Sequence, residues 1–262
     1  MGYEYERLPK DTFEYEIQIA KLEALRQNMK INTKKLFVTM DNGIYDSLHI
    51  EGNALTRNEI TYILEHDVTI RGASSRDYLQ AKNYIDALAL LKEWIMRKEC
   101  FDINEDTIKE IHYLLTKDEL SLKESGQYRQ EPVHIRFTDY IPPDEYSVPE
   151  HMQELCDIYN SSKNHPFEFD KICEFKRNFE RIHPFIDGNG RTGRFLMNLM
   201  LLQNGYGYFS APFHERDLYF RSLDDNTFHE YAVGKVIANM EEIRERYHSK
   251  EEELDHDTKR ER

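Results

Sequence analysis

Residues 183 to 194 bring together several side chains that could carry out phosphate chemistry, in the order His183-Pro184-Phe185-Ile186-Asp187-Gly188-Asn189-Gly190-Arg191-Thr192-Gly193-Arg194. His183 can accept a proton near neutral pH, and Asp187 offers the hard oxygen ligand that Mg²⁺ on a nucleotide prefers. Arg191 and Arg194 carry guanidinium groups that match phosphate oxygens. These residue types predict a phosphate-binding site with a metal carboxylate and a base.

Two expected helices position this loop. Apolar side chains recur at helical spacing from 175 to 182, and Pro184 with the Gly188-Asn189-Gly190 turn ends that pattern. A second apolar pattern, from 195 to 202, predicts a helix that begins at the glycines. The free backbone N–H groups and the dipole at the start of that helix favour an anion, best of all phosphate.

Two other interpretations of the loop are weaker. Gly188-x-Gly190-x-x-Gly193 matches the dinucleotide-binding pattern, and Glu215 stands at a passable distance for the ribose acid. That pattern requires a preceding strand, whereas the segment before this loop is expected to be helical. A glycine-rich turn with a solvated basic face is disfavoured because seven polar or glycine positions occur together.

The stretch resembles the signature of the Fic family, His-x-Phe-x-(Asp/Glu)-Gly-Asn-Gly-Arg-x-x-Arg, and meets every defined position. The resemblance implies an all-α fold, a helical bundle with one short β-hairpin flap, that transfers the AMP part of ATP to a protein hydroxyl. The intact Gly-Asn-Gly segment favours AMP transfer over transfer of other groups. By the same resemblance His183 is the general base, Asp187 holds Mg²⁺, Gly188, Asn189 and Gly190 cradle the phosphates, and Arg191 and Arg194 bind the triphosphate.

A second informative stretch is Ser47-Leu48-His49-Ile50-Glu51-Gly52-Asn53. Ser47 and Glu51 are spaced to share one face of a helix, which a solvated helix surface would also explain. Beside the loop at 183 to 194, the stretch resembles the Fic inhibitory motif, (Ser/Thr)-x-x-x-Glu-(Gly/Asn), in the subgroup that carries it before the catalytic core. The resemblance implies an inhibitory helix at about 45–54, whose Glu51 pairs with Arg194 and keeps it from the γ-phosphate of ATP.

Residues 121 to 143 change to a different pattern. Val133, His134 and Ile135 alternate between apolar and polar types, which predicts an edge hairpin strand, and Pro142-Pro143 closes it. A surface β-hairpin alone would account for this pattern. In the Fic family this position is the flap, which binds a target segment by β-addition. The segment departs from the family in having Arg136-Phe137 where a glycine often follows.

The remaining chain is organised around these segments. We expect a helical extension at 1–35, a Fic-like core at 36–225, and a C-terminal helix with a charged tail at 226–262. Within this scheme, 36–40 reads as a short strand followed by a turn at 41–43. Thr56 and Glu59 form a capping box for the next helix. Further helices are expected at 13–30, 75–97, after Asn104, and after Pro149.

Composition narrows the class of protein. The net charge of −14 disfavours nucleic acid as a partner. Cys100, Cys156 and Cys173 lack metal-binding spacing and are expected to be buried, reduced thiols of a cytoplasmic protein. No signal peptide and no transmembrane run is found, so no membrane partner is expected.

Three functions compete on these grounds. The first is a Mg²⁺-dependent protein adenylyltransferase autoinhibited by Glu51. Its candidate partners are ATP, an unknown target protein, the enzyme itself and further copies of the chain in a homo-oligomer. The second is a de-AMPylating hydrolase, or a bifunctional enzyme, that uses the same site with Glu51 orienting a water. The third is a non-catalytic nucleotide-binding regulator, which would have no need of a base at His183.

Overall fold

The computed structural model describes residues 13–28, 33–97, 102–136, 138–161 and 168–260, with side chains up to residue 244. These residues form helices and connecting loops, and none of them belongs to a β-strand. The expected all-α class is therefore confirmed. The helices are α1 (Phe13–Asn28), α2 (Thr33–Ile50), α3 (Arg57–His66), α4 (Ser75–Arg97), α5 (Glu105–Thr116), α6 (Val148–Ser161), α7 (Glu168–Ile182), α8 (Asn189–Gln203), the short 3-10 turn η1 (Phe213–Glu215), α9 (Arg216–Asp224) and α10 (Phe228–Arg260).

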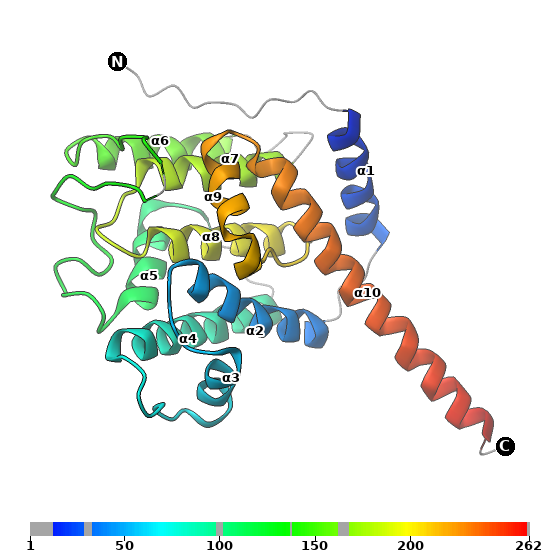
Figure 1. Cartoon of the computed structure of the whole chain (residues 1–262). Helices are drawn as coiled ribbons and strands as arrows, with labels where there is room; N and C mark the ends of the chain where they lie inside the picture. The colour runs from blue at the N-terminus through cyan, green and yellow to red at the C-terminus, as the bar shows by residue number, and fades with distance from the viewer. Residues whose placement is uncertain (1–12, 29–32, 98–101, 137, 162–167, 261–262) are drawn as a thin grey trace.

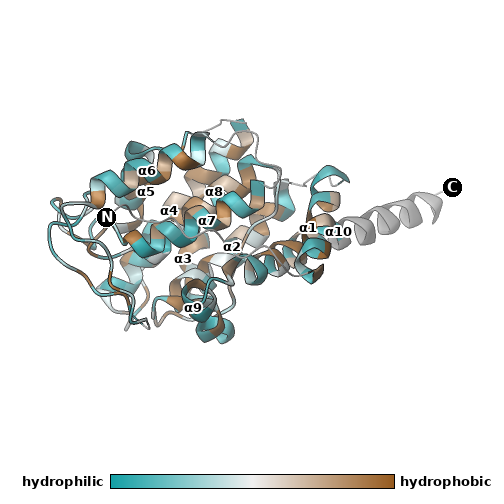
Figure 2. Cartoon of the chain, turned by 90° about the horizontal axis from the view of Figure 1, so that it is seen from above, coloured by the Kyte–Doolittle hydropathy of each residue, from teal (hydrophilic) through white to brown (hydrophobic). Residues whose placement is uncertain are grey.

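Helices α7 and α8 pack along each other near the middle of the molecule (Figure 1). Helix α8 also contacts α5, α5 contacts α4, and α4 contacts α2. The hydrophobic residues concentrate on these inner helices, as the colours of α8 and α4 show in Figure 2. Phe175 and Phe179 of α7 and Phe195 and Leu199 of α8 are at most 2% exposed. Each such burial contributes about 1.5–3 kcal/mol, so the loop between α7 and α8 is held at both ends by the core.

The expected strand at 36–40 and the turn at 41–43 are wrong, because both segments lie inside α2. Gly43 is needed for packing, since a Cβ on it would lie 2.5 Å from a ring carbon of Tyr208. Apolar side chains recur every four residues along α2, so they form one buried face instead of alternating between two faces of a strand. This face consists of Leu36, Met40, Ile44 and Leu48, each at most 2% exposed.

The expected β-hairpin flap is not observed either. Val133, His134 and Ile135 lie in a loop that pairs with no other strand within the described ranges. Hydrogen bonds from the side chain of Arg129, instead of backbone pairing between two strands, join the two ends of this loop. The guanidinium donates to the carbonyl of Glu131 at 3.1 Å and to the carbonyl of Pro143.

Several local predictions are confirmed. Thr56 and Glu59 form the capping box of α3, and Asn104 caps α5 by accepting a hydrogen bond from the backbone N–H of Thr107. Cys156 and Cys173 are buried free thiols, while Cys100 and Phe137 lie outside the described residues. Helix α10 continues to Arg260, so the charged tail is helical. Across the described ranges, no helix combines the length and apolar character needed to cross a bilayer.

Candidate active site

The backbone of His183 is shaped to present its imidazole ring. Helix α7 ends at Ile182, and His183 adopts a left-handed conformation with φ of 50°, which is uncommon for a residue other than glycine. Nδ1 of His183 lies 3.1 Å from the carbonyl oxygen of Glu180. A carbonyl only accepts, so the proton sits on Nδ1 and Nε2 keeps its lone pair. Burial lowers the pKa of His183, so the ring is neutral at pH 7 and can act as a base.

The loop after His183 is held together by its own polar groups. Asn189 accepts a hydrogen bond from the backbone N–H of Phe185 at 2.9 Å and donates to its carbonyl at 2.8 Å. The side chain of Asn189 therefore braces the loop, which leaves the backbone at the start of α8 to face an anion. Gly188 has a φ of 80° at the N-cap of α8, a conformation that glycine adopts without strain.

A buried histidine supports the loop from behind. His112 receives a hydrogen bond from the backbone N–H of Gly126 at its Nδ1, so its Nε2 carries the proton and donates to the carbonyl of Asp187 at 2.9 Å. The ring of His112 stacks on Phe185 at a centroid distance of 3.6 Å. Burial lowers the pKa of His112 to about 4, so it remains a neutral structural group at neutral pH.

The loop and the predicted inhibitory segment face one shared cavity of about 260 Å³. His183, Asp187, Gly188, Asn189, Gly190 and Arg191 line it from the loop, and Glu51 lines it from the end of α2. The structure therefore brings the predicted base, metal carboxylate, phosphate cradle and inhibitory glutamate into one place.

Arg194 is the residue through which the two segments meet. Its Nη2 lies 2.8 Å from Oε1 of Glu51 and donates to the carbonyl of Ser47 at 2.9 Å, while its Nε donates to the Ser47 hydroxyl at 3.0 Å. Burial alone would lower the pKa of Arg194, but the Glu51 carboxylate raises it above its ordinary value. Arg194 is thus a charged, buried group whose counter-charge comes from Glu51.

Glu51 lies over the start of α8. A Cβ built on Gly190 would fall 2.0 Å from Oε1 of Glu51, so only glycine leaves room for this carboxylate. The N-terminus of a helix is a favourable place for an anion. In this structure the anion at the start of α8 is the carboxylate of Glu51.

Arg191 has a different environment. Its Nη1 lies 2.7 Å from Oε2 of Glu119 and donates to the carbonyl of Leu115 at 3.1 Å. The side chains of Arg191 and Glu119 are only 2% and 4% exposed. Arg191 therefore fastens α8 to the end of α5, and this nitrogen is already engaged there.

Asp187 offers one carboxylate to a metal. Its side chain is 44% exposed, and among the described residues no group of three or more His, Cys, Asp or Glu side chains could hold a metal by itself. Mg²⁺ commonly binds through one or two carboxylates together with substrate phosphates. The residues present therefore fit a Mg²⁺ ion that arrives with a nucleotide.

Comparisons with known proteins agree with this geometry. The family model described as Fic/DOC family matches residues 102–201 of this chain. The chain is 33% identical over 184 residues to protein adenylyltransferase fic-1 of Caenorhabditis elegans, covering 69% of this chain and 35% of that protein. It is 32% identical over 188 residues to protein adenylyltransferase Fic of Nematostella vectensis, and this match covers 69% of this chain and 42% of that protein.

The fold is similar to a solved structure as well. A solved fragment of Fic-1 from C. elegans superposes with a TM-score of 0.80 at 25% identity, covering 90% of this chain and 74% of that chain. The chain belongs to the Fic family.

The Fic chain described here spans well under half the length of these two relatives, 35% of one and 42% of the other. Of its predicted flap residues, His134 and Ile135 line the active-site cavity, whereas Val133 is not part of the lining. The segment therefore borders the site without forming a strand. Its role in binding a target stays a prediction.

Sequence reasoning assigned no role to several residues of this Fic site. Lys176 is fully buried in α7, where it pairs with Glu180 and donates to the hydroxyl of Tyr219 at 3.0 Å. Burial alone would raise the pKa of Glu180, but Lys176 and then His183 lower it. A lysine within an otherwise buried helix face was the available signal, since an isolated buried charge is costly.

Arg76 and Glu119 were missed as well. Arg76 bridges Asp187 and Glu119 from the first turn of α4. A positive charge at the start of a helix opposes the helix dipole, and that local conflict was the only signal in the sequence. Glu119 lies in a loop of ordinary composition and gave none.

Proposed function

We propose that this protein transfers AMP from ATP to a hydroxyl group of a target protein, and that Glu51 inhibits the reaction by pairing with Arg194. The observation that carries the proposal is the shared cavity, where a neutral histidine with a free Nε2 faces a helix N-terminus occupied by a carboxylate. The names of the relatives, protein adenylyltransferases, support the same activity.

In the proposed reaction the oxygen of the target hydroxyl forms a bond to the α-phosphorus of ATP, and the bond from that phosphorus to the bridging oxygen breaks. Nε2 of His183 takes the hydroxyl proton, and pyrophosphate leaves. Mg²⁺ bound with ATP at Asp187 would neutralise charge on the phosphates. The backbone of Gly188, Asn189 and Gly190 and the guanidinium of Arg194 would hold the phosphate oxygens.

The inhibition follows from a competition for one guanidinium and one anion site. While Glu51 lies 2.8 Å from Arg194, the γ-phosphate has no free arginine at that position. Because Oε1 of Glu51 lies over Gly190, its negative charge also repels a phosphate at the helix N-terminus. ATP therefore binds productively only after Glu51 moves away.

A second candidate function is hydrolytic removal of AMP from a modified protein. The Glu51 carboxylate lies close enough to His183 to raise its pKa against the lowering effect of burial. A water between these two groups would be oriented by Glu51 and deprotonated by His183. This reaction requires Glu51 in place, whereas AMP transfer requires it displaced.

Labelled ATP distinguishes these functions. We expect the Glu51→Gly chain, incubated with a panel of proteins or alone, to retain label on protein from α-labelled ATP and none from γ-labelled ATP. Label retained only from the γ position would identify a kinase and would contradict the proposal. Release of AMP from a pre-modified protein by the wild-type chain, lost in Glu51→Gly, would identify the hydrolase.

A further inference from the structure

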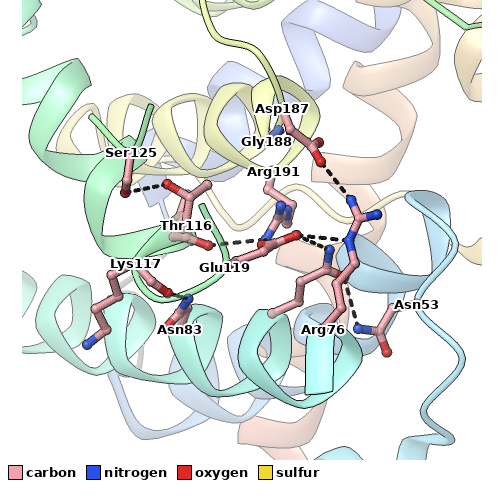
Figure 3. A network of polar contacts seen from close by, with 12 residues as sticks. Asn53, Arg76, Asn83, Thr116, Lys117, Glu119, Ser125, Asp187, Gly188 and Arg191 are labelled. Carbon is pink, nitrogen blue, oxygen red and sulfur yellow. Dashed lines mark hydrogen bonds and ion pairs between the residues drawn. The ribbon is translucent and has the colours of Figure 1, made fainter. Parts of the chain in front are cut away.

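The carboxylate of Asp187 is already paired with an arginine. Nη2 of Arg76 lies 2.6 Å from Oδ2 of Asp187 (Figure 3). Both residues line the active-site cavity. The other carboxylate oxygen, Oδ1, accepts a hydrogen bond from the backbone N–H of Gly188 at 2.6 Å. Each oxygen of this carboxylate therefore already has one partner, and the partner of Oδ2 is the positively charged one.

Arg76 is anchored independently of Asp187. Its Nε donates to Oε1 of Glu119 at 3.1 Å. Glu119 is only 4% exposed and is held by Arg191 at 2.7 Å (Figure 3). It also accepts a hydrogen bond from Gln80 at 2.6 Å. Arg76 can therefore release Asp187 while it stays attached to a buried, immobile partner.

The position of Arg76 in its helix also points to a role. It is the second residue of α4, where the positive end of the helix dipole disfavours a cation. Its side chain is 60% exposed, so it contributes little to the core. The two carboxylates that it bridges are the contacts that offset this unfavourable position.

We propose that Arg76 takes the place of Mg²⁺ on Asp187 in the nucleotide-free protein and so sets the metal concentration that the site needs. The inference rests on the proposed function only in assigning Mg²⁺ to Asp187. A guanidinium and a metal ion on the same carboxylate oxygen repel each other. Mg²⁺ therefore binds Asp187 more readily once Arg76 has released it.

Metal binding can be measured without any reaction. ATP binding by the full chain carrying Glu51→Gly and His183→Ala, titrated at a series of Mn²⁺ concentrations with Mn²⁺ as the probe for Mg²⁺, reports how much metal the site needs. We expect Arg76→Ala to lower the half-saturating Mn²⁺ concentration about two- to fivefold, as suits an exposed ion pair. Arg71→Ala removes the same charge from an exposed position in the loop before α4 and should have no effect. Asp187→Asn, combined with Arg76→Ala, should remove the added affinity.

Three results would overturn the inference. They are an equal Mn²⁺ requirement for ATP binding with and without Arg76→Ala, an added affinity that survives Asp187→Asn, and weaker ATP binding by Arg76→Ala in EDTA. The last result, measured in a His183→Ala background, would make Arg76 a phosphate ligand. Failure of the α-label experiment with the Mn²⁺ shift intact would reject the proposed function and leave the role of Arg76 standing.

Discussion

Arg191 and Arg194 lie on the same helix and are both almost fully buried, yet they meet very different carboxylates. The partner of Arg191 is Glu119, at 2.7 Å, whose side chain is 4% exposed. The partner of Arg194 is Glu51, at 2.8 Å, whose side chain is 30% exposed. Arg191 itself lines the cavity, but its partner Glu119 does not, whereas for Arg194 it is the partner, Glu51, that lines the cavity.

The two carboxylates also differ in the number of groups that hold them. Glu119 also accepts hydrogen bonds from Gln80 and Arg76. Oε1 of Glu51 lies at ion-pair distance from Arg194 but makes no aligned hydrogen bond in the described part of the chain. Two arginines of one motif therefore have different surroundings, and these depend on which distant segment supplies the partner of each.

The largest effect should come from removal of the proposed base, His183, which lines the same cavity as Glu51, the partner of Arg194. His183→Ala should reduce AMP transfer by roughly 10²- to 10⁴-fold and leave ATP affinity nearly unchanged, because His183 is not expected to contact the triphosphate. Initial rates with α-labelled ATP and a binding titration check both parts in the Glu51→Gly background. Near-normal transfer by His183→Ala would remove His183 from the mechanism.

Substitutions of the two arginines should affect different properties. Arg191→Ala should mainly lower the stability of the fold, and Arg194→Ala should mainly weaken ATP binding. Arg191→Ala leaves Glu119 buried without one of its counter-charges, and the loss of a buried partner costs about 3 to 5 kcal/mol of unfolding free energy. Arg194→Ala should cost less, because Glu51 is partly exposed, and should weaken ATP binding by roughly 1.5 to 3 kcal/mol. Urea denaturation and ATP titration of both variants test this. Equal stability losses would contradict the contrast between the two pairs.

Removal of the releasable carboxylate should activate the enzyme. Glu51→Gly frees Arg194 and removes the negative charge over Gly190, so AMP transfer, seen as self-modification, should rise on the order of 5- to 150-fold. Glu51→Gln should do nearly as much if charge pairing is the main restraint. Glu51→Gly with Arg194→Ala should lose the gain. A double variant as active as Glu51→Gly alone would refute the pairing.

The smallest effect concerns pH. Burial lowers the pKa of His183 below its ordinary value of 6.5, and the Glu51 carboxylate acts against that lowering. Since the base works in its neutral form, kcat/KM should fall on the acid side with a midpoint below 6.5. The midpoint should be lower still in Glu51→Gly than in the wild-type chain. A midpoint that rises in Glu51→Gly would show that Glu51 does not act on His183.

Individual helices could be predicted from the sequence where apolar residues recur at helical spacing or where a capping residue precedes the helix. The helix before His183, the helix after Gly188 and the capping box of Thr56 depend on neighbours within one or two turns. The run at 36–40 was misread because a short apolar run fits either a strand or a helix. Packing of its apolar side chains on one buried face, and of Tyr208 against Gly43, decided for the helix.

Residue types and short spacings by themselves predicted a phosphate-binding loop at residues 183–194. The all-α fold class and the pairing of Glu51 with Arg194 were implied by the resemblance of two short motifs to the Fic family. Only the tertiary structure decided that Arg191 belongs to Glu119 and that Arg76 holds Asp187. Those pairs join segments far apart in the chain. Their geometry depends on how α4, α5 and α8 pack, and no local pattern of charges encodes that packing.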